Sequence, residues 1–299
     1  MPDSTAILEK KLPGLLMQES MADHTSFKIG GPARYFFPAR DNASFIKAIR
    51  LARELQLRYF ILGNGSNILV SDHGFDGLVI KQENNHIQYE GTLVVAESGV
   101  KLQKLIRDSI AHHLTGLEYL MSIPGTVGGG VAGNVGTPRK GEWIDEHIVS
   151  VEILDAASSI KVIPRSECNF EYRMSRFKYS ETEIIISATF QLAQAPQSLI
   201  QQKVKDFLDK RSHQPINLPC AGSVFKNPPG KKSWQLIDEV GLRGKKIGGA
   251  MVSPEHANFI VNAGGATAED VAILISYIKQ QVRDRLGVQL NEEIKYIGF

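Results

Sequence analysis

Apolar residues recur along this chain with two periods, one typical of helices and one typical of strands. Asp41 stands before a stretch whose apolar residues are spaced for one helical face, namely Phe45, Ile46, Ile49, Ala52 and Leu55. We therefore expect a helix that Asp41 caps. The run 59–62 predicts a short buried strand directly afterwards. The first part of the chain should thus fold as an α/β unit.

Further along, short β-type runs predict strands at 77–81, 87–89, 93–96, 148–154, 160–163 and 184–192. One amphipathic helix is predicted between them, with its apolar face formed by Leu102, Leu105, Ile106 and Ile110. After the polar segment 194–197 the pattern changes to a helix whose apolar face carries Ile200, Val204, Phe207 and Leu208. This change indicates a domain boundary near residue 196, where a smaller C-terminal domain begins.

The clearest predicted helix lies in this C-terminal part. It begins at Thr267, with Asp270 three residues later as in a capping box, and it ends before Gly287. Its apolar residues are Val271, Leu274, Ile275, Ile278, Val282 and Leu286. Burial in a core explains this apolar face fully, so we assign the helix no further role.

Composition narrows the class of protein. With 299 residues, 42% of them apolar, the chain can form about two or three domains. Its net charge of +2 is too small to attract a polyanion electrostatically, so we expect no nucleic-acid partner. Two cysteines, no signal-peptide pattern and no long apolar run predict a cytoplasmic protein without a membrane contact. The histidines show no metal-ligand spacing, so no metal is predicted.

Two glycine-rich strings are candidate phosphate sites. They are Gly63-Asn64-Gly65-Ser66-Asn67 and Ile123-Pro124-Gly125-Thr126-Val127-Gly128-Gly129. Small residues let backbone N–H groups approach a phosphate, although such strings also form ordinary turns. Neither string matches the dinucleotide fingerprint or the Walker loop, which disfavours a Rossmann dehydrogenase and a P-loop NTPase. A diphosphate cofactor held by another fold stays open.

Six segments, in chain order, resemble the signature segments of the UDP-N-acetylenolpyruvoylglucosamine reductase family. They are 25–33 (TSFKIGGPA), 63–70 (GNGSNILV), 123–129 (IPGTVGG), 172–178 (YRMSRFK), 221–228 (AGSVFKNP) and 256–261 (HANFIV). The resemblance extends from about Thr25 to Ile297 and is closest to the shorter, type II branch. It implies an α+β protein: an FAD-binding region of the vanillyl-alcohol-oxidase/PCMH type with two subdomains, plus a C-terminal α+β domain that binds a UDP-sugar.

The same resemblance implies the boundaries and the reaction. We expect FAD-binding subdomains at 1–80, with the tail 294–299, and at 81–196, and a UDP-sugar domain at 197–293. The implied reaction reduces the enolpyruvyl group of UDP-N-acetylglucosamine enolpyruvate to UDP-N-acetylmuramate for peptidoglycan synthesis. FAD and NADPH are the implied cofactors, the UDP-sugar is the partner, and we expect a monomer.

Site residues follow from the same alignment. The two glycine strings would line the FAD pyrophosphate and the neighbouring flavin. The family's activating arginine falls on Arg173, its proton donor on Ser223 and its C-terminal glutamate on Glu293, with Glu292 as an alternative alignment. Binding of the UDP moiety is implied for Asn227, with Arg211 and Lys226 as cationic candidates.

Two other functions stay open. An FAD-dependent oxidase of the same fold could use the glycine strings but would have little use for Arg173 together with Ser223. A non-catalytic nucleotide-binding module would need neither Arg173 nor Ser223. Taken alone, Arg, Ser and Glu residues are mostly surface residues without a catalytic role. The chain also departs from the family, because the segment 133–138 lacks the aromatic residue of many members and Lys295 replaces an arginine. These changes bear on flavin-edge packing, not on the reaction.

Overall fold

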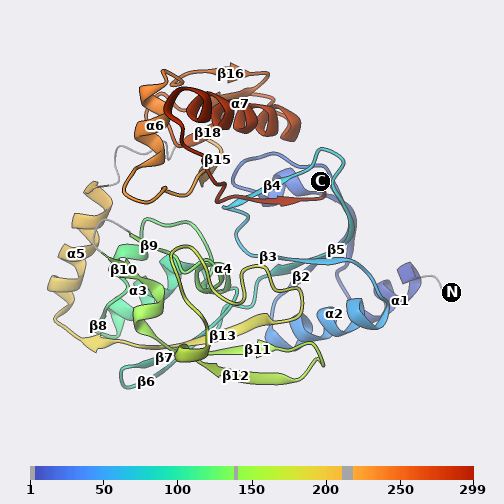
Figure 1. Ribbon diagram of the computed structural model, residues 1–299. Helices are drawn as coiled ribbons and strands as arrows, with labels where there is room; N and C mark the ends of the chain where they lie inside the picture. Colours follow the sequence, from blue (N-terminus) through green and yellow to red (C-terminus); the bar gives the residue numbers. More distant parts are fainter. Residues whose placement is uncertain (1–3, 138–140, 211–217) are drawn as a thin grey trace. The chain divides into compact units, whose positions relative to one another are not determined.

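The computed structural model describes residues 4–137, 141–210 and 218–299 (Figure 1). Arg211, a predicted ligand of the UDP diphosphate, lies outside the described residues. The chain divides into two compact units. Unit 1 comprises 1–15, 37–64 and 80–211, and unit 2 comprises 16–36, 65–79 and 212–299. Each unit is therefore assembled from segments that are far apart in the sequence.

The α-helices are α1 (Ser4–Lys11), α2 (Asn42–Glu54), α3 (Leu102–Ala111), α4 (Val127–Ala132), α5 (Gln197–Lys210), α6 (Ser233–Glu239) and α7 (Ala268–Leu286). Short 3-10 helices are η1 (Met21–His24), η2 (Glu118–Leu120), η3 (Ile144–His147) and η4 (Arg165–Glu167). Within the described part of the chain, none of these helices combines the length and apolar character needed to cross a membrane.

The first strands are β1 (Leu16–Ser20), β2 (Pro32–Ala39), β3 (Tyr59–Leu62), β4 (Ile68–Val70), β5 (Phe75–Gln82), β6 (Ile87–Glu90), β7 (Leu93–Glu97), β8 (Leu114–Thr115), β9 (Gly136–Thr137) and β10 (Glu142–Trp143). They are followed by β11 (Ile148–Leu154), β12 (Ile160–Pro164), β13 (Ile184–Gln191), β14 (Ala193–Gln194), β15 (Cys220–Ser223), β16 (Lys246–Ile247), β17 (Ala250–Val252), β18 (Phe259–Asn262) and β19 (Lys295–Ile297). The strands expected from the hydrophobic pattern are confirmed as β3, β5, β6, β7, β11, β12 and β13.

Helices α2 and α7 begin where their capping residues predict. The Asp41 carboxylate accepts the Ser44 N–H at 2.7 Å and completes a capping box. At α7, Thr267 Oγ1 accepts the Asp270 N–H at 3.0 Å, and the Asp270 carboxylate accepts the Thr267 N–H at 3.1 Å. Backbone hydrogen bonds from Thr267 and then Gly249 lower the pKa of Asp270. Both predicted caps are therefore confirmed.

Unit 1 is built around an antiparallel sheet with the order β12-β11-β13-β7-β6. Helices α3 and α4 cover one face of this sheet (Figure 1). The buried side chains between them include Leu105 and Val131 from the helices and Val151, Ala188 and Phe190 from the strands. Helix α5, which follows the predicted boundary near residue 196, packs against α3, β8 and η2 of this unit.

Unit 2 contains a second antiparallel sheet with the order β15-β18-β17-β16. Its core joins the apolar face of α7, including Leu274 and Ile278, to Ile237 of α6 and Ile260 of β18. The last strand, β19, pairs in parallel with β4. The Asp72 carboxylate also accepts N–H groups from the first turn of α7, at 2.9 and 3.1 Å. The segment 65–79 is thus fastened to the C-terminal part of the chain.

Replacement of Thr267 by alanine should destabilise unit 2 without affecting its chemistry. The change removes a side-chain acceptor for the first turn of α7, so we expect a loss of about 1 kcal/mol in the free energy of unfolding. Urea denaturation monitored by circular dichroism measures this loss. Ser276→Ala removes a hydroxyl from an exposed position within α7 and is the matched control. Equal stability of the two variants would contradict the assigned cap.

Candidate active site

The two predicted glycine strings contact each other in unit 1 through Gly63 and Thr126. A Cβ atom added to Gly63 would lie 2.7 Å from Thr126 Oγ1, which is closer than a real side chain allows. Lys81 of β5 donates a hydrogen bond to the Gly63 carbonyl oxygen, and burial lowers the pKa of this lysine. Only glycine permits this approach of the two strings, because it has no side chain.

The second string is partly helical, although its glycines predict a loop. Thr126 Oγ1 caps helix α4 by accepting the Gly129 N–H at 3.3 Å. The Val127 N–H and the Gly128 N–H donate to protein carbonyl oxygens, each at 2.8 Å, the second to that of Ser98. Gly128 therefore contributes through its fit against Ser98, because its own amide already has a protein acceptor. A Cβ on Gly128 would lie 2.9 Å from Ser98 Cβ.

The carbonyl oxygens and the amides of the first string differ in their hydrogen bonds. The carbonyl oxygens of Gly63, Gly65 and Asn67 accept hydrogen bonds from other parts of the protein. In contrast, the amides of Asn64 and Gly65 donate to no acceptor in the residues that the structure describes. Gly65 has a φ of 65°, which favours glycine. Unpaired amides at a loop without bulk are suited to phosphate oxygens, so this string fits a diphosphate cofactor.

Arg173 lies in a tight turn of unit 1. The backbone groups of Glu171 and Met174 close this turn with reciprocal hydrogen bonds of 3.0 and 3.1 Å. The φ of Arg173 is 57°, in the left-handed region that a residue with a side chain rarely adopts. Its side chain is half-buried. A strained backbone at a predicted catalytic residue is consistent with a functional constraint.

Helix α4 connects the second glycine string to this turn. Beyond the helix, the Asn134 side-chain amide donates to the Glu171 carbonyl oxygen at 3.1 Å. The Ser175 hydroxyl donates to the carbonyl oxygen of Ala132, the last residue of α4, at 2.8 Å. The glycine string and the Arg173 turn are therefore held by one short helix.

Unit 2 brings Ser223 and Glu293 into one neighbourhood. Ser223 ends β15, and the Glu293 N–H donates to the carbonyl oxygen of the next residue, Val224, at 2.8 Å. The Asn67 side-chain amide donates to the Glu293 carbonyl oxygen at 3.2 Å. Two predicted catalytic residues and the end of the first glycine string therefore lie close together, although they are far apart in the sequence.

Glu292 has a structural partner. Its carboxylate lies 2.6 Å from the Lys279 ammonium of α7. Burial and then a hydrogen bond to Glu292 raise the pKa of Tyr296. The choice of Glu293 over Glu292 as the catalytic glutamate stays a prediction.

Asn227 and Lys226, which are predicted to bind the UDP moiety, are more exposed than the core of unit 2 and each has a hydrogen-bond partner. Asn227 is exposed, and its side-chain oxygen accepts the Ser233 N–H at 3.0 Å. Lys226 is half-buried, and its N–H donates to the Asn291 carbonyl oxygen at 2.8 Å. Arg173 belongs to unit 1, whereas Ser223 and Glu293 belong to unit 2. The expected convergence of these three catalytic residues stays a prediction.

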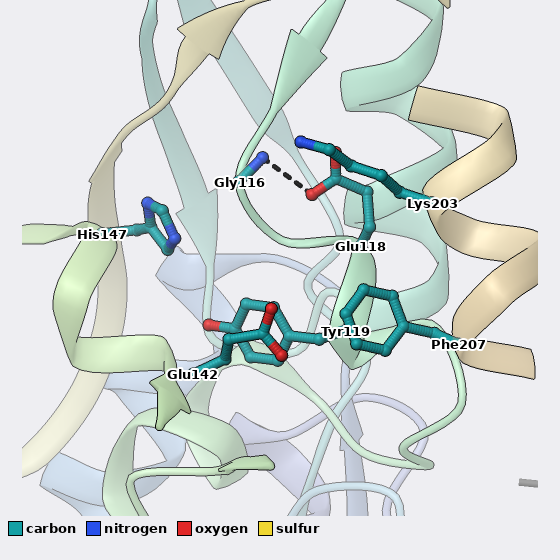
Figure 2. Close-up of a pocket in the computed structure, with 7 residues that line it drawn as sticks. All are labelled: Gly116, Glu118, Tyr119, Glu142, His147, Lys203 and Phe207. Carbon is teal, nitrogen blue, oxygen red and sulfur yellow. Dashed lines mark hydrogen bonds and ion pairs between the residues drawn. The ribbon is translucent and has the colours of Figure 1, made fainter. Parts of the chain in front are cut away.

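A cavity of about 280 Å³ in unit 1 is separate from the predicted site residues (Figure 2). Its lining residues are Gly116, Glu118, Tyr119, Glu142, His147, Lys203 and Phe207. Glu118 accepts the Gly116 N–H at 2.9 Å and lies 3.9 Å from the Lys203 ammonium. Two carboxylates against one ammonium disfavour a phosphate here.

Across the described ranges, no group of three or more His, Cys, Asp or Glu side chains is arranged to hold a metal ion.

The comparisons with known proteins define first the class of this chain and then its family. Residues 32–163 match the family described as FAD binding domain, and residues 214–297 match the C-terminal domain of UDP-N-acetylenolpyruvoylglucosamine reductase. A structure of a glucose dehydrogenase shares the fold, with a TM-score of 0.50 and 16% identity over 65% of this chain and 44% of that one. The class is therefore that of FAD-dependent oxidoreductases.

Several proteins named UDP-N-acetylenolpyruvoylglucosamine reductase match nearly the whole chain. The UDP-N-acetylenolpyruvoylglucosamine reductase of Carboxydothermus hydrogenoformans is 41% identical over 95% of this chain and 94% of its own length. That of Caldanaerobacter subterraneus subsp. tengcongensis is 39% identical over the same shares. The crystal structure of the reductase from Thermus caldophilus matches with a TM-score of 0.80 and 31% identity over 95% of this chain and 98% of that one. This chain belongs to the UDP-N-acetylenolpyruvoylglucosamine reductase family.

Replacement of Gly63 by alanine should weaken FAD binding. The new Cβ would overlap Thr126 Oγ1, and overpacking of this kind costs about 1–3 kcal/mol, so we expect roughly tenfold weaker binding. Titration of the apoprotein with FAD measures the affinity. Gly133→Ala is the control, because its added Cβ would lie at an ordinary 3.4 Å from the nearest atom. Equal flavin affinity of both variants would show that the contact between the strings is dispensable.

Proposed function

We propose that this chain reduces the enolpyruvyl group of UDP-N-acetylglucosamine enolpyruvate to UDP-N-acetylmuramate with NADPH as reductant. The product is a precursor of peptidoglycan. The observation that carries the proposal is the backbone link between Val224 and Glu293, which places Ser223 and Glu293 together in a domain of this reductase family. FAD, which the two glycine strings would hold, would supply the hydride transfer from NADPH to the vinyl carbon.

The FAD site consists of the two glycine strings. The proposed FAD-binding residues are Gly63, Asn64, Gly65, Ser66 and Asn67 of the first string and Ile123, Pro124, Gly125, Thr126, Gly128 and Gly129 of the second. The amides of Asn64 and Gly65 are the donors for phosphate oxygens, because they have no acceptor among the described residues. Gly63 and Gly128 contribute by the absence of a side chain, which permits the close packing of the strings.

Arg173 binds the carboxylate of the enolpyruvyl group. Hydride addition to the terminal vinyl carbon leaves an electron pair on the adjacent carbon, and this pair spreads onto the carboxylate. A guanidinium is permanently charged, so it stabilises this negative charge more strongly in the transition state than in the substrate. The strained turn holds the backbone of Arg173 in one conformation.

Ser223 supplies the proton that completes the reduction. Its hydroxyl proton forms the new C–H bond at the adjacent carbon, and solvent returns a proton to the serine oxygen. A serine can act as the acid because an enolic carbanion is a strong base. Glu293 orients the reacting groups beside Ser223, while the Lys279–Glu292 pair fixes its segment.

The UDP moiety is bound by Asn227, Lys226 and Arg211. Lys226 and Arg211 supply positive charge for the diphosphate, and Asn227 supplies side-chain hydrogen bonds.

We further propose that the enzyme is a cytoplasmic monomer. The proposed domains remain 1–80 with the tail 294–299, 81–196 and 197–293.

The purified protein should be yellow and should oxidise NADPH slowly unless the enolpyruvyl UDP-sugar is present. Because no separate nicotinamide site is visible in the sequence, both substrates should use one flavin face in turn and give ping-pong kinetics. Initial rates at varied concentrations of both substrates test this. Rapid peroxide production without the UDP-sugar would instead favour an FAD-dependent oxidase, and a ternary complex would contradict the shared face.

Replacement of Ser223 by alanine should slow the reduction of the vinyl group by about 10²- to 10⁴-fold, the usual contribution of a general acid. Reduction of the flavin by NADPH should stay normal, because that step needs no proton from Ser223. Stopped-flow absorbance of the flavin measures the two half-reactions separately. Ser223→Cys, which retains an ionisable proton, should recover part of the rate. Equal loss in both half-reactions would contradict the assigned role, and a non-catalytic module would show no turnover to impair.

A further inference from the structure

The Arg173 guanidinium lies beside two aromatic rings of unit 1. Its central carbon is 5.6 Å from the centroid of the Trp143 ring and 5.9 Å from that of Tyr172. The two rings are 5.6 Å apart at an angle of 81°, an edge-to-face arrangement. Cations within about 6 Å of a ring centroid are attracted by the negative face of the ring, and tryptophan attracts them most strongly.

Trp143 is placed there by a small hairpin. Strand β10 pairs with β9 so that Trp143 lies opposite Gly136. A Cβ on Gly136 would lie 2.7 Å from Trp143 Cε3, so a glycine is required for the indole to lie over the opposite strand. The next residue, Ile144, is fully buried and its N–H donates to the Val135 carbonyl oxygen at 2.9 Å. The position of the indole is therefore set by packing and backbone pairing.

The backbone of Arg173 is fixed independently of its side chain. The reciprocal bonds between Glu171 and Met174 close the turn, and the Lys178 ammonium donates to the Arg173 carbonyl oxygen at 2.7 Å. An arginine side chain nevertheless has several rotatable bonds beyond Cα, and each has more than one staggered state. Contacts of the guanidinium itself therefore decide its orientation, and those with the Trp143 and Tyr172 rings are among them.

We propose that Trp143 is a positioning residue for Arg173. Its indole, with the Tyr172 ring, holds the guanidinium in one orientation before the carboxylate of the substrate arrives. The negative face of an aromatic ring attracts the guanidinium and so restricts the rotation of the arginine side chain. This inference rests on the proposed role of Arg173.

Replacement of Trp143 by leucine should slow the reduction of the vinyl group by roughly 3- to 30-fold, the range expected when a cation–π contact is lost. Reduction of the flavin by NADPH should be unchanged. Trp143→Phe should recover part of the rate, because it restores a ring without the larger indole. Tyr89→Leu is the matched control, since Tyr89 is an aromatic residue of the same unit that stacks on His112. The two half-reactions are measured by stopped-flow absorbance of the flavin.

A double-mutant cycle separates failure of this inference from failure of the proposed function. If Trp143 acts through Arg173, Trp143→Leu should have no further effect in an Arg173→Ala background. Additive effects, or a normal vinyl reduction in Trp143→Leu, would overturn the positioning role. If Arg173→Ala itself reduces the vinyl group at the normal rate, the proposed role of Arg173 fails instead.

A spectroscopic measurement gives a second criterion that does not depend on turnover. The ring current of Trp143 should displace the side-chain Nε–Hε resonance of Arg173 in the NMR spectrum of the full chain. This resonance should move towards its ordinary position in Trp143→Leu, move less in Trp143→Phe and stay in place in Tyr89→Leu. An unmoved resonance in Trp143→Leu would also overturn the proposal, and the phenylalanine variant provides the test if the leucine variant does not fold.

Discussion

The close approach of Gly63 to Thr126 is the contact on which the candidate site of unit 1 depends. It brings two glycine strings together only because Gly63 has no side chain. Thr126 also caps α4, and residues at the far end of α4 hold the turn that contains Arg173. A change at Gly63 can therefore affect the contact between the strings directly and the position of Arg173 through the helix.

In unit 2, hydrogen bonds to the backbone of Glu293 bring distant parts of the chain together. The Glu293 N–H bonds to Val224, and the Asn67 side chain bonds to the Glu293 carbonyl oxygen. The Lys279–Glu292 ion pair adds a connection to α7, whose apolar face forms much of the core. Main-chain hydrogen bonds therefore fix the path of the C-terminal segment that carries Glu293.

Trp143 provides an aromatic side chain close to the segment in which this chain lacks the aromatic residue of many family members. The segment 133–138 lacks the aromatic residue that many members carry. The opposite strand of the same hairpin supplies an indole across from Gly136, and this indole contacts the guanidinium of Arg173. The indole beside Arg173 thus comes from a residue that the motif comparison does not select.

The sequence by itself determined the features that depend on neighbouring residues: the caps of α2 and α7, the strand β3, the composition of the glycine strings and the family to which the motifs belong. Only the tertiary structure decided that residues 127–132 form a helix despite three glycines, that Arg173 adopts a left-handed backbone and that Glu292 pairs with Lys279. Capping and periodicity act over a few positions and are therefore readable locally. The other features arise from packing and hydrogen bonds between segments that are distant in the chain, which no local pattern records.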